Sequence, residues 1–334
     1  MENKEKIVLT GDRPTGKLHL GHYIGALIQR VELQKKYKQF VMVADVQALT
    51  DNADNPEKVR TNTFEVTLDN LAVGVDPSKT TFFIQSQIPE LAELTVYFLN
   101  LVTLARLKRN PTVKDEMKQK GFGEDVPVGF LCYPISQASD ILSFKGNLVP
   151  VGEDQVPVIE QTNEIAEKFN SFYGEVFQKA EPLLTKTSRL VGIDGKGKMS
   201  KSLDNAIYLA DSSEVIEEKV MSMYTDPDHI KVEDPGKIEG NVVFTYLDAF
   251  DTDKKGLEEL KEKYQKGGVG DVLIKKRLIG VLLEILNPIR EKREYLEKDP
   301  KYVMDILEEG TKKARKVVQD TLKEVKQAMK LNYF

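Results

Sequence analysis

Two of the three histidines in this chain stand close together in residues 19–22, which have the sequence HLGH. They follow a short β-branched run that ends at Thr10 and the turn residues 11–16. A spacing of i, i+3 places both imidazoles on one face of a helix start, where unpaired backbone N–H groups and the helix dipole favour an anion. Gly21 has no Cβ, so a flat ligand can approach the backbone there. We therefore predict a cradle for a phosphate and a nucleobase.

Other interpretations of this glycine turn are weaker. A tight turn with two surface histidines is the plainest of them. The segment is neither a GxxxxGK[ST] loop nor a dinucleotide-binding GxGxxG turn after a strand. A zinc site needs a third ligand, and neither a nearby carboxylate nor Cys132 offers one at ligand spacing. We therefore expect no metal bound by the protein itself.

A second group of reactive side chains lies in residues 188–205, a segment rich in Gly, Lys and Ser that is expected to form a mobile loop. Two ammonium groups three residues apart on such a loop can close over a polyphosphate and stabilise charge that develops only in the transition state. A solvated basic loop is the alternative. The five central residues, with the sequence KMSKS, are Lys198, Met199, Ser200, Lys201 and Ser202.

A third set of polar side chains follows one helical face. Tyr133, Gln137 and Asp140 recur at i, i+4 and i+7, and Pro134 suits the first turn of that helix. A solvated face is the alternative, but apolar residues on the other faces favour a buried polar face over a cleft. A buried Asp140 needs a hydrogen-bond donor, which a ligand N–H or O–H can supply. An indole N–H and a phenol O–H both fit, so these residues leave the identity of the donor open.

The elements that position these side chains follow from hydrophobic periodicity. Strands are expected at 7–10, 40–44 and 81–85, with helices at 23–37 and 56–73 between them. This β-α-β order predicts an α/β fold, a Rossmann-like parallel sheet with helices on both faces and a ligand site beyond the carboxyl ends of its strands.

The strand signal fades from about Glu214, and segments such as 275–286 and 311–329 have helical apolar spacing. We predict a Rossmann-like domain at 1–205 and an α-helical domain at 206–334. The last helix can pack back on the Rossmann-like domain.

Composition limits the partners. The 334 residues carry a net charge of −5, so nucleic acid can bind only at local patches. Basic clusters at 312–316 and 275–277 can contact phosphates, and a solvated helix face explains them equally well. A single cysteine and the absence of an apolar leader or membrane span predict a soluble, cytoplasmic protein, with no DNA partner expected.

The two short motifs together resemble the paired signature of the class I aminoacyl-tRNA synthetases. HYIGAL at 22–27, LAVGVDPSKTTFFIQSQIPE at 71–90, VPVGEDQ at 149–155 and MYTDP at 223–227 resemble the bacterial tryptophanyl-tRNA synthetases, over nearly the whole chain. The resemblance implies activation of L-tryptophan with ATP and its Mg²⁺, release of pyrophosphate, and transfer of tryptophan to tRNA(Trp). It also implies that the domain at 1–205 is catalytic and that the helical domain at 206–334 binds the tRNA anticodon. A homodimer is implied as well, for which the apolar helices of 89–128 can supply the interface.

The resemblance also implies roles for individual residues. The catalytic groups implied are His22, Lys198 and Lys201. The ATP contacts implied are Arg13, Pro14, Thr15, Gly21, His22, Gly152, Glu153, Asp154, Leu190, Lys198, Met199, Ser200, Lys201 and Ser202. The tryptophan pocket implied comprises Leu9, Gly11, Tyr133, Gln137, Asp140 and Gln155, with Asp140 accepting the indole N–H and Tyr133 near the ammonium group.

Two positions depart from the family pattern. Gln137 stands where many bacterial members carry methionine, and Gln47 where some carry histidine. Tyrosyl-tRNA synthetases also show glutamine at the first position, but they carry tyrosine where this chain has Leu9. A tyrosyl-tRNA synthetase is therefore the alternative, followed by a catalytically inactive RNA-binding relative and a small-molecule nucleotidyltransferase. Both motifs are intact, which opposes the inactive relative.

Overall fold

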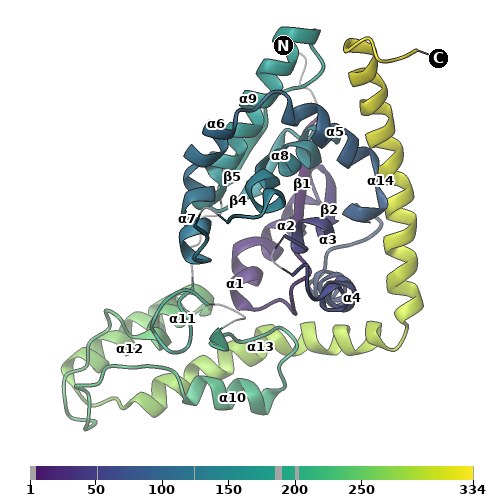
Figure 1. Cartoon of the computed structure of the whole chain (residues 1–334). Coiled ribbons are helices and arrows are strands. Elements are labelled where there is room, and N and C mark those ends of the chain that lie inside the picture. The colour runs from purple at the N-terminus through teal and green to yellow at the C-terminus, as the bar shows by residue number, and fades with distance from the viewer. Residues whose placement is uncertain (1–4, 51, 124, 185–189, 200–202, 334) are drawn as a thin grey trace. The chain divides into compact units, whose positions relative to one another are not determined.

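A parallel β-sheet forms the centre of the fold in the computed structural model, which describes residues 5–50, 52–123, 125–184, 190–199 and 203–333. Within these residues the sheet has five strands in the order β3-β2-β1-β4-β5 (Figure 1). Their bounds are β1 Ile7–Asp12, β2 Lys38–Val43, β3 Thr80–Ile84, β4 Leu148–Val151 and β5 Glu181–Leu184. After β1, the chain adds β2 and β3 on one side of this strand. It then returns and adds β4 and β5 on the other side. The predicted parallel sheet is confirmed, and its switch point lies between β1 and β4.

The first strand is longer than expected because its turn residues also pair. Gly11 lies opposite Met42, and Asp12 lies opposite Val43. A Cβ on Gly11 would come within 2.7 Å of the Met42 carbonyl oxygen, so only glycine allows this close approach. The ladder therefore extends to the loop that begins the candidate site.

Two predicted helices show how local signals succeed and fail. Helix α4 (Pro56–Val73) has the predicted bounds, because Asn55 caps its start and Gly74, at φ 115°, ends it. The helix predicted at 23–37 is instead composed of α1 (Leu20–His22), the π-helical η1 (Tyr23–Leu27) and α2 (Ile28–Leu33). It begins early because His19 caps it.

The remaining helices include α8 (Val128–Ser143), which carries the three predicted polar residues. Pro134 lies inside α8 and not in its first turn, so that prediction was wrong. The proline gives up one backbone bond, and packing of α8 against α5 and α9 keeps the helix intact. The other bounds are α3 Asp45–Ala48, η2 Gln85–Gln87, α5 Glu90–Leu99, α6 Leu104–Arg109, α7 Pro111–Gln119, η3 Glu153–Gln155, α9 Val156–Tyr173, α10 Ser213–Met221, α11 Val242–Phe250, α12 Lys254–Lys266, α13 Asp271–Glu297 and α14 Pro300–Ala328.

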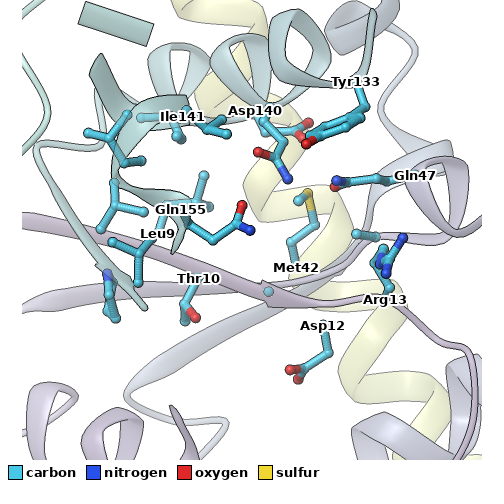
Figure 2. Close-up of a pocket in the computed structure, with 18 of the residues that line it drawn as sticks. Leu9, Thr10, Asp12, Arg13, Met42, Gln47, Tyr133, Asp140, Ile141 and Gln155 are labelled. Atoms are coloured by element: carbon cyan, nitrogen blue, oxygen red, sulfur yellow. The ribbon is translucent and has the colours of Figure 1, made fainter. Parts of the chain in front are cut away.

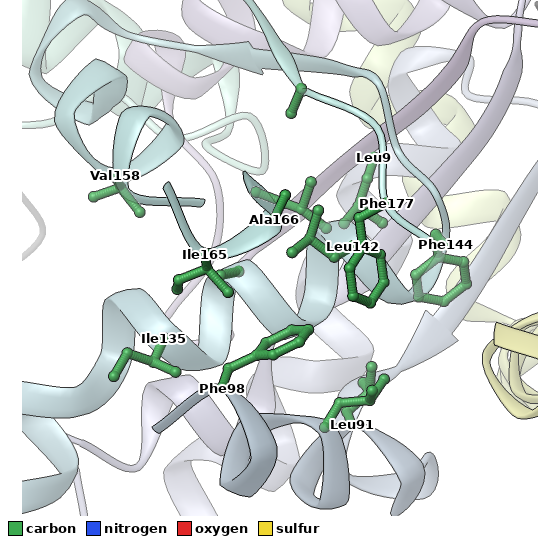
Figure 3. Close-up of a cluster of buried hydrophobic side chains, with 14 of the residues drawn as sticks. Leu9, Leu91, Phe98, Ile135, Leu142, Phe144, Val158, Ile165, Ala166 and Phe177 are labelled. Carbon is green, nitrogen blue, oxygen red and sulfur yellow. The ribbon is translucent and has the colours of Figure 1, made fainter. Parts of the chain in front are cut away.

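The hydrophobic core that fixes α8 lies between this helix, the sheet and its helical neighbours (Figure 3). Leu91 and Phe98 of α5 and Ile165 of α9 pack in the same buried cluster as Ile135 and Leu142 of α8. Burying side chains of this size stabilises the fold by about 1.5–3 kcal/mol each. The polar face of α8 is therefore held in a fixed orientation.

The chain divides into two compact units. One comprises Met1–Gly16, Ala26–Thr185 and Asp299–Phe334, and the other comprises Lys17–Gly25 and Lys186–Lys298. The first unit contains the sheet and α14, and the second contains α10 to α13 together with both short motifs. The functional boundary predicted at residue 205 stays a prediction. No helix among the described residues is long and apolar enough to cross a membrane.

Helix α14 packs against β3 and α5 inside the first unit. A Cβ on Gly310 would lie 1.9 Å from the Phe82 carbonyl oxygen, so glycine is required for this contact. The Ile84 N–H donates to the Thr311 hydroxyl at 3.1 Å. The last helix thereby covers the edge of β3 and satisfies one of its open backbone groups.

Candidate active site

A cavity of about 340 Å³ opens in the first unit at the carboxyl ends of β1, β2 and β4, next to α8 (Figure 2). Its position beside the switch point of the sheet is where parallel α/β folds bind ligands, and its volume is that of a small-molecule site. All six residues predicted to contact tryptophan line it, namely Leu9, Gly11, Tyr133, Gln137, Asp140 and Gln155. Arg13 and Gly152 of the predicted ATP set also line it.

Asp140 is the most deeply buried polar group of this cavity, with 2% of the residue exposed. Its two carboxylate oxygens accept hydrogen bonds of 3.0 and 2.9 Å from Nε2 of Gln85. Burial raises the pKa of Asp140 to about 7, the bond from Gln85 opposes this shift, and the charge of Asp45 adds to it. The predicted burial is confirmed, and the chain itself supplies one donor in addition to any ligand.

Gln85 was not predicted as a site residue. It directly follows β3, and the carboxyl ends of parallel strands meet at one edge of the sheet. That position was the only signal in the sequence. Its partner Asp140 is 55 residues away in the chain, so local spacing could not link them.

Tyr133 faces the cavity with a buried hydroxyl that has no hydrogen-bond partner among the described residues. Burial and the nearby charge of Glu116 both raise the pKa of this phenol. Glu116 also lines the cavity, and burial raises the pKa of its carboxyl group. A buried polar atom without a partner costs free energy, so Tyr133 is placed to bond a polar group of a ligand.

The cavity has apolar walls and amide groups at its margin. Leu9, Met42 and Ile141 supply apolar surface, and Gln47 and Gln155 supply amides around the same space (Figure 2). A lining that combines apolar surface with hydrogen-bonding side chains suits a flat aromatic ligand that also carries polar groups. The two residues that depart from the family pattern, Gln47 and Gln137, both line this cavity.

Arg30 of α2 holds the end of β1 through bonds to residues that line the cavity. Its guanidinium is buried and donates to both carboxylate oxygens of Asp12, at 2.5 and 3.0 Å. It also donates to the Thr10 hydroxyl, the Gly11 carbonyl and the Asn70 side-chain oxygen. This network fixes the strand end from which Arg13 continues.

The two histidines of the HLGH motif lie close together in the second unit, with ring centroids 3.9 Å apart. Nδ1 of His19 accepts the Gly21 N–H, and Nδ1 of His22 accepts the His19 N–H. Each neutral ring therefore carries its proton on Nε2. The rings share a face, as predicted.

The expected row of unpaired backbone N–H groups is absent from this short helix, so that part of the prediction was wrong. The Leu20 N–H donates to Ile207, and the His22 and Tyr23 N–H groups donate to the His19 carbonyl. A Cβ on Gly21 would contact the His19 ring at 2.9 Å and the Met199 sulfur at 3.6 Å. Glycine here lets the two motifs approach each other.

The basic loop has a defined backbone in its described part. Lys198 pairs with Val191 in an isolated bridge, and the buried Met199 donates its N–H to the Leu190 carbonyl at 3.2 Å. Lys198 is exposed and Leu190 is buried. Ser200, Lys201 and Ser202 lie outside the described residues, and the mobility of the loop stays a prediction.

The helical part of the second unit holds this loop. The Tyr246 hydroxyl of α11 donates to the Val191 carbonyl at 2.8 Å. The Tyr224 N–H donates to the Ile193 carbonyl at 3.0 Å. The backbone position of the loop therefore depends on residues outside the motif.

The other predicted ATP residues occupy two turns of the first unit. Gly152, Glu153 and Asp154 follow β4, and a Cβ on Gly152 would come within 2.7 Å of the Asp154 carboxylate. Pro14 and Thr15 follow β1, where the Thr15 N–H donates to the Arg13 carbonyl. Of these five residues, Gly152 alone lines the cavity. The nucleotide contacts of the other four stay predictions.

The basic clusters are largely engaged within the protein. Arg315 donates to Glu90, and Lys312 pairs with Glu308 and Glu309. Lys275 donates to the Met221 carbonyl, and Arg277 pairs with Asp251 and Asp253. This pattern favours a structural role over phosphate binding for these four side chains. No group of three metal-ligating side chains occurs among the described residues.

Comparison with known proteins gives a consistent result. The family model described as tRNA synthetases class I (W and Y) matches residues 1–287. A tryptophan–tRNA ligase from Clostridium longisporum is 58% identical over 99% of this chain and 98% of its own length, and one from Streptococcus pneumoniae is 57% identical over 98% of each. The tryptophanyl-tRNA synthetase of Campylobacter jejuni, solved with ADP and tryptophan, is 33% identical, with a TM-score of 0.85 over 97% of this chain and 99% of its own.

Proposed function

The chain belongs to the class I tRNA synthetases of the tryptophan and tyrosine group, and we infer from this premise that its reaction is the ligation of tryptophan to tRNA. It activates L-tryptophan with ATP to tryptophanyl-adenylate and pyrophosphate. It then transfers the tryptophanyl group to tRNA(Trp). The relatives at 57–58% identity over nearly the full length carry this activity in their names.

The single observation that carries this assignment is the buried carboxylate of Asp140 in a cavity that also has apolar walls. An ionised carboxylate only accepts hydrogen bonds, and an indole N–H only donates one, so the two groups match. A phenol hydroxyl would also donate, but its oxygen then needs a donor of its own. The family resemblance puts that partner at position 9, where this chain has the apolar Leu9.

The geometry supports a specific orientation of the amino acid. Asp140 accepts the indole N–H, and the unpartnered hydroxyl of Tyr133 accepts a bond from the ammonium group. One oxygen of the tryptophan carboxylate attacks the α-phosphorus of ATP. The new bond joins that oxygen to phosphorus, and the bond to the departing pyrophosphate breaks.

The motif residues act on the charge that develops in this step. The ammonium groups of Lys198 and Lys201 stabilise negative charge on the phosphates, and the protonated Nε2 of His22 donates to a phosphate oxygen. Mg²⁺ enters with ATP as part of the substrate, since this ion is commonly bound through substrate phosphates. A tRNA hydroxyl then attacks the acyl carbon and AMP leaves.

We also propose a homodimer in the cytoplasm. Large apolar side chains are exposed within the predicted interface region, including Val96, Leu104 and Val128. Val128 is 76% exposed, which is costly for a monomer in water. Burial of these side chains in a second copy would remove that cost.

Aminoacylation of a tRNA(Trp) transcript tests the complete reaction. The expected result is transfer of labelled tryptophan to this transcript and no transfer of tyrosine to tRNA(Tyr). Tyrosine transfer would assign the chain to the tyrosine enzymes, and no transfer of either amino acid would favour an inactive RNA-binding protein. Light scattering of the same sample tests the dimer.

A further inference from the structure

The carboxylate that selects the indole has a dedicated protein donor. Gln85 is 4% exposed and Asp140 is 2% exposed, so neither side chain gains much from water. Nε2 of Gln85 lies 3.0 and 2.9 Å from the two oxygens of Asp140. An ionised carboxylate at this depth is costly, and a donated bond offsets part of that cost.

The orientation of the Gln85 amide is fixed from its other end. The backbone N–H of Gln47 donates to Oε1 of Gln85 at 3.2 Å, so the oxygen must face Gln47. The amino group then has to face Asp140. A rotated amide would place its oxygen against the carboxylate and its N–H₂ group against another N–H donor.

The backbone around Gln85 is fixed as well. The neighbouring Ser86 N–H donates to the Asp45 carboxylate at 2.9 Å. Asp45 and Gln47 lie in α3, which follows β2, and Gln85 begins η2, which follows β3. Two adjacent strand ends therefore hold this one amide in place.

We propose that Gln85 is a positioning residue for amino acid selection, which aims the Asp140 carboxylate at the indole nitrogen of tryptophan and keeps its remaining acceptor sites open. This role rests on the proposed function. A carboxylate has about four acceptor sites, and the two bonds from Gln85 leave capacity for an indole N–H. Without Gln85 the carboxylate is free to rotate or to become protonated, and a protonated group accepts less well.

The test compares two substrates that differ only at the indole nitrogen. In 3-benzothienylalanine a sulfur atom replaces the N–H group, so this analogue cannot donate to Asp140. ATP–pyrophosphate exchange gives kcat/KM for both amino acids on one preparation, and their ratio does not depend on the folded fraction. The parent chain is expected to prefer tryptophan by roughly tenfold to a hundredfold.

The substitution Gln85→Leu should lower this preference to within about threefold, because the misplaced carboxylate no longer accepts a hydrogen bond from the indole N–H group. Gln85→Met, with an unbranched side chain of similar length, should act in the same way and serves if the leucine variant is unstable. Gln87→Leu is the matched control, since Gln87 is exposed on the same turn and its amide donates to the neighbouring Ser86 hydroxyl. It should keep the parental preference.

The outcomes separate the two proposals. A parent chain that does not exchange with tryptophan overturns the proposed function. A parent chain that prefers tryptophan, together with Gln85 variants that keep the full preference, overturns the positioning role alone. An equal loss of kcat/KM for both substrates also overturns it, because that loss shows a purely structural effect.

Discussion

The proposed amino acid cavity and the two motifs proposed to bind the nucleotide are built in different ways. In the first unit, side chains bond to side chains, as between Asp140 and Gln85 or between Arg30 and Asp12. In the second unit, the motifs are held mainly through the backbone. Leu20 donates to Ile207, Leu209 donates to Leu18, and Met199 donates to Leu190.

This difference indicates where each kind of specificity resides. A pocket held by side chains is sensitive to single substitutions, because each change leaves a buried partner unsatisfied. A motif held by its backbone keeps its geometry when a side chain changes, so its exposed lysine is available for chemistry. Substitutions in the pocket region should therefore affect stability and amino acid selection, and substitutions of motif lysines should affect rate.

The largest effect is expected for Arg30→Met in the first unit. Removing the guanidinium breaks its buried pair with Asp12 and should lower the free energy of unfolding by about 3–5 kcal/mol. Urea denaturation measures this change. Lys35→Met, which removes an exposed pair with Glu32, should change it by less than about 0.5 kcal/mol. Equal losses in the two variants would contradict the importance of the buried network.

The next effect is on rate and not on stability. Lys201→Ala should slow adenylate formation by about a hundredfold to a thousandfold, because one donor to the developing phosphate charge is lost. Its urea midpoint should stay that of the parent. Lys196→Ala, which changes an exposed lysine of the same loop, should alter the rate by less than about threefold. Parental rates in the Lys201 variant would remove the loop from the mechanism.

The pH dependence of stability sharpens the description of the pocket. The pKa of Asp140 is raised to about 7 in the folded chain. Between about pH 4 and pH 7 the folded state therefore holds a proton that the unfolded state has lost. As pH rises through that range, this group lowers the free energy of unfolding. Asp140→Asn carries no charge. It should therefore be more stable than the parent by roughly 4 kcal/mol at pH 8, with the difference disappearing near pH 4. A difference independent of pH would show that Asp140 is not a buried ionisable group.

The smallest effect tests the helical support of the loop. Tyr246→Phe removes one hydrogen bond to the Val191 carbonyl, which contributes about 1 kcal/mol. Adenylate formation should slow by about fivefold while KM for tryptophan stays within twofold. Tyr295→Phe, which changes an exposed ring, is the control. A change confined to KM for tryptophan would show that this tyrosine acts on the pocket.

The sequence predicted the parts of the fold that depend on local pattern. The six pocket residues, which fall in one cavity, came from the family resemblance. Three of the parallel strands, the bounds of α4 and the shared face of Tyr133, Gln137 and Asp140 follow from periodicity and capping. Such signals involve residues within a turn or two of each other. They fail where a local rule conflicts with packing, as at Pro134, which tertiary contacts keep inside a helix.

Long-range pairing could not be predicted. Gln85 meets Asp140 across 55 residues, and Arg315 meets Glu90 across 225. The first pair adds a hydrogen-bond donor to the pocket. The second pairs Arg315 with a carboxylate, although the sequence suggested that this side chain could contact phosphates. Both depend on which surfaces the fold brings together, and no spacing rule carries that information.

ATP–pyrophosphate exchange with the purified chain against all twenty amino acids tests the central claim most directly. Exchange is expected with tryptophan alone, and added tryptophan supplies its own fluorescence signal because the chain contains no tryptophan. Exchange with tyrosine in place of tryptophan, or no exchange with any amino acid, would contradict that claim.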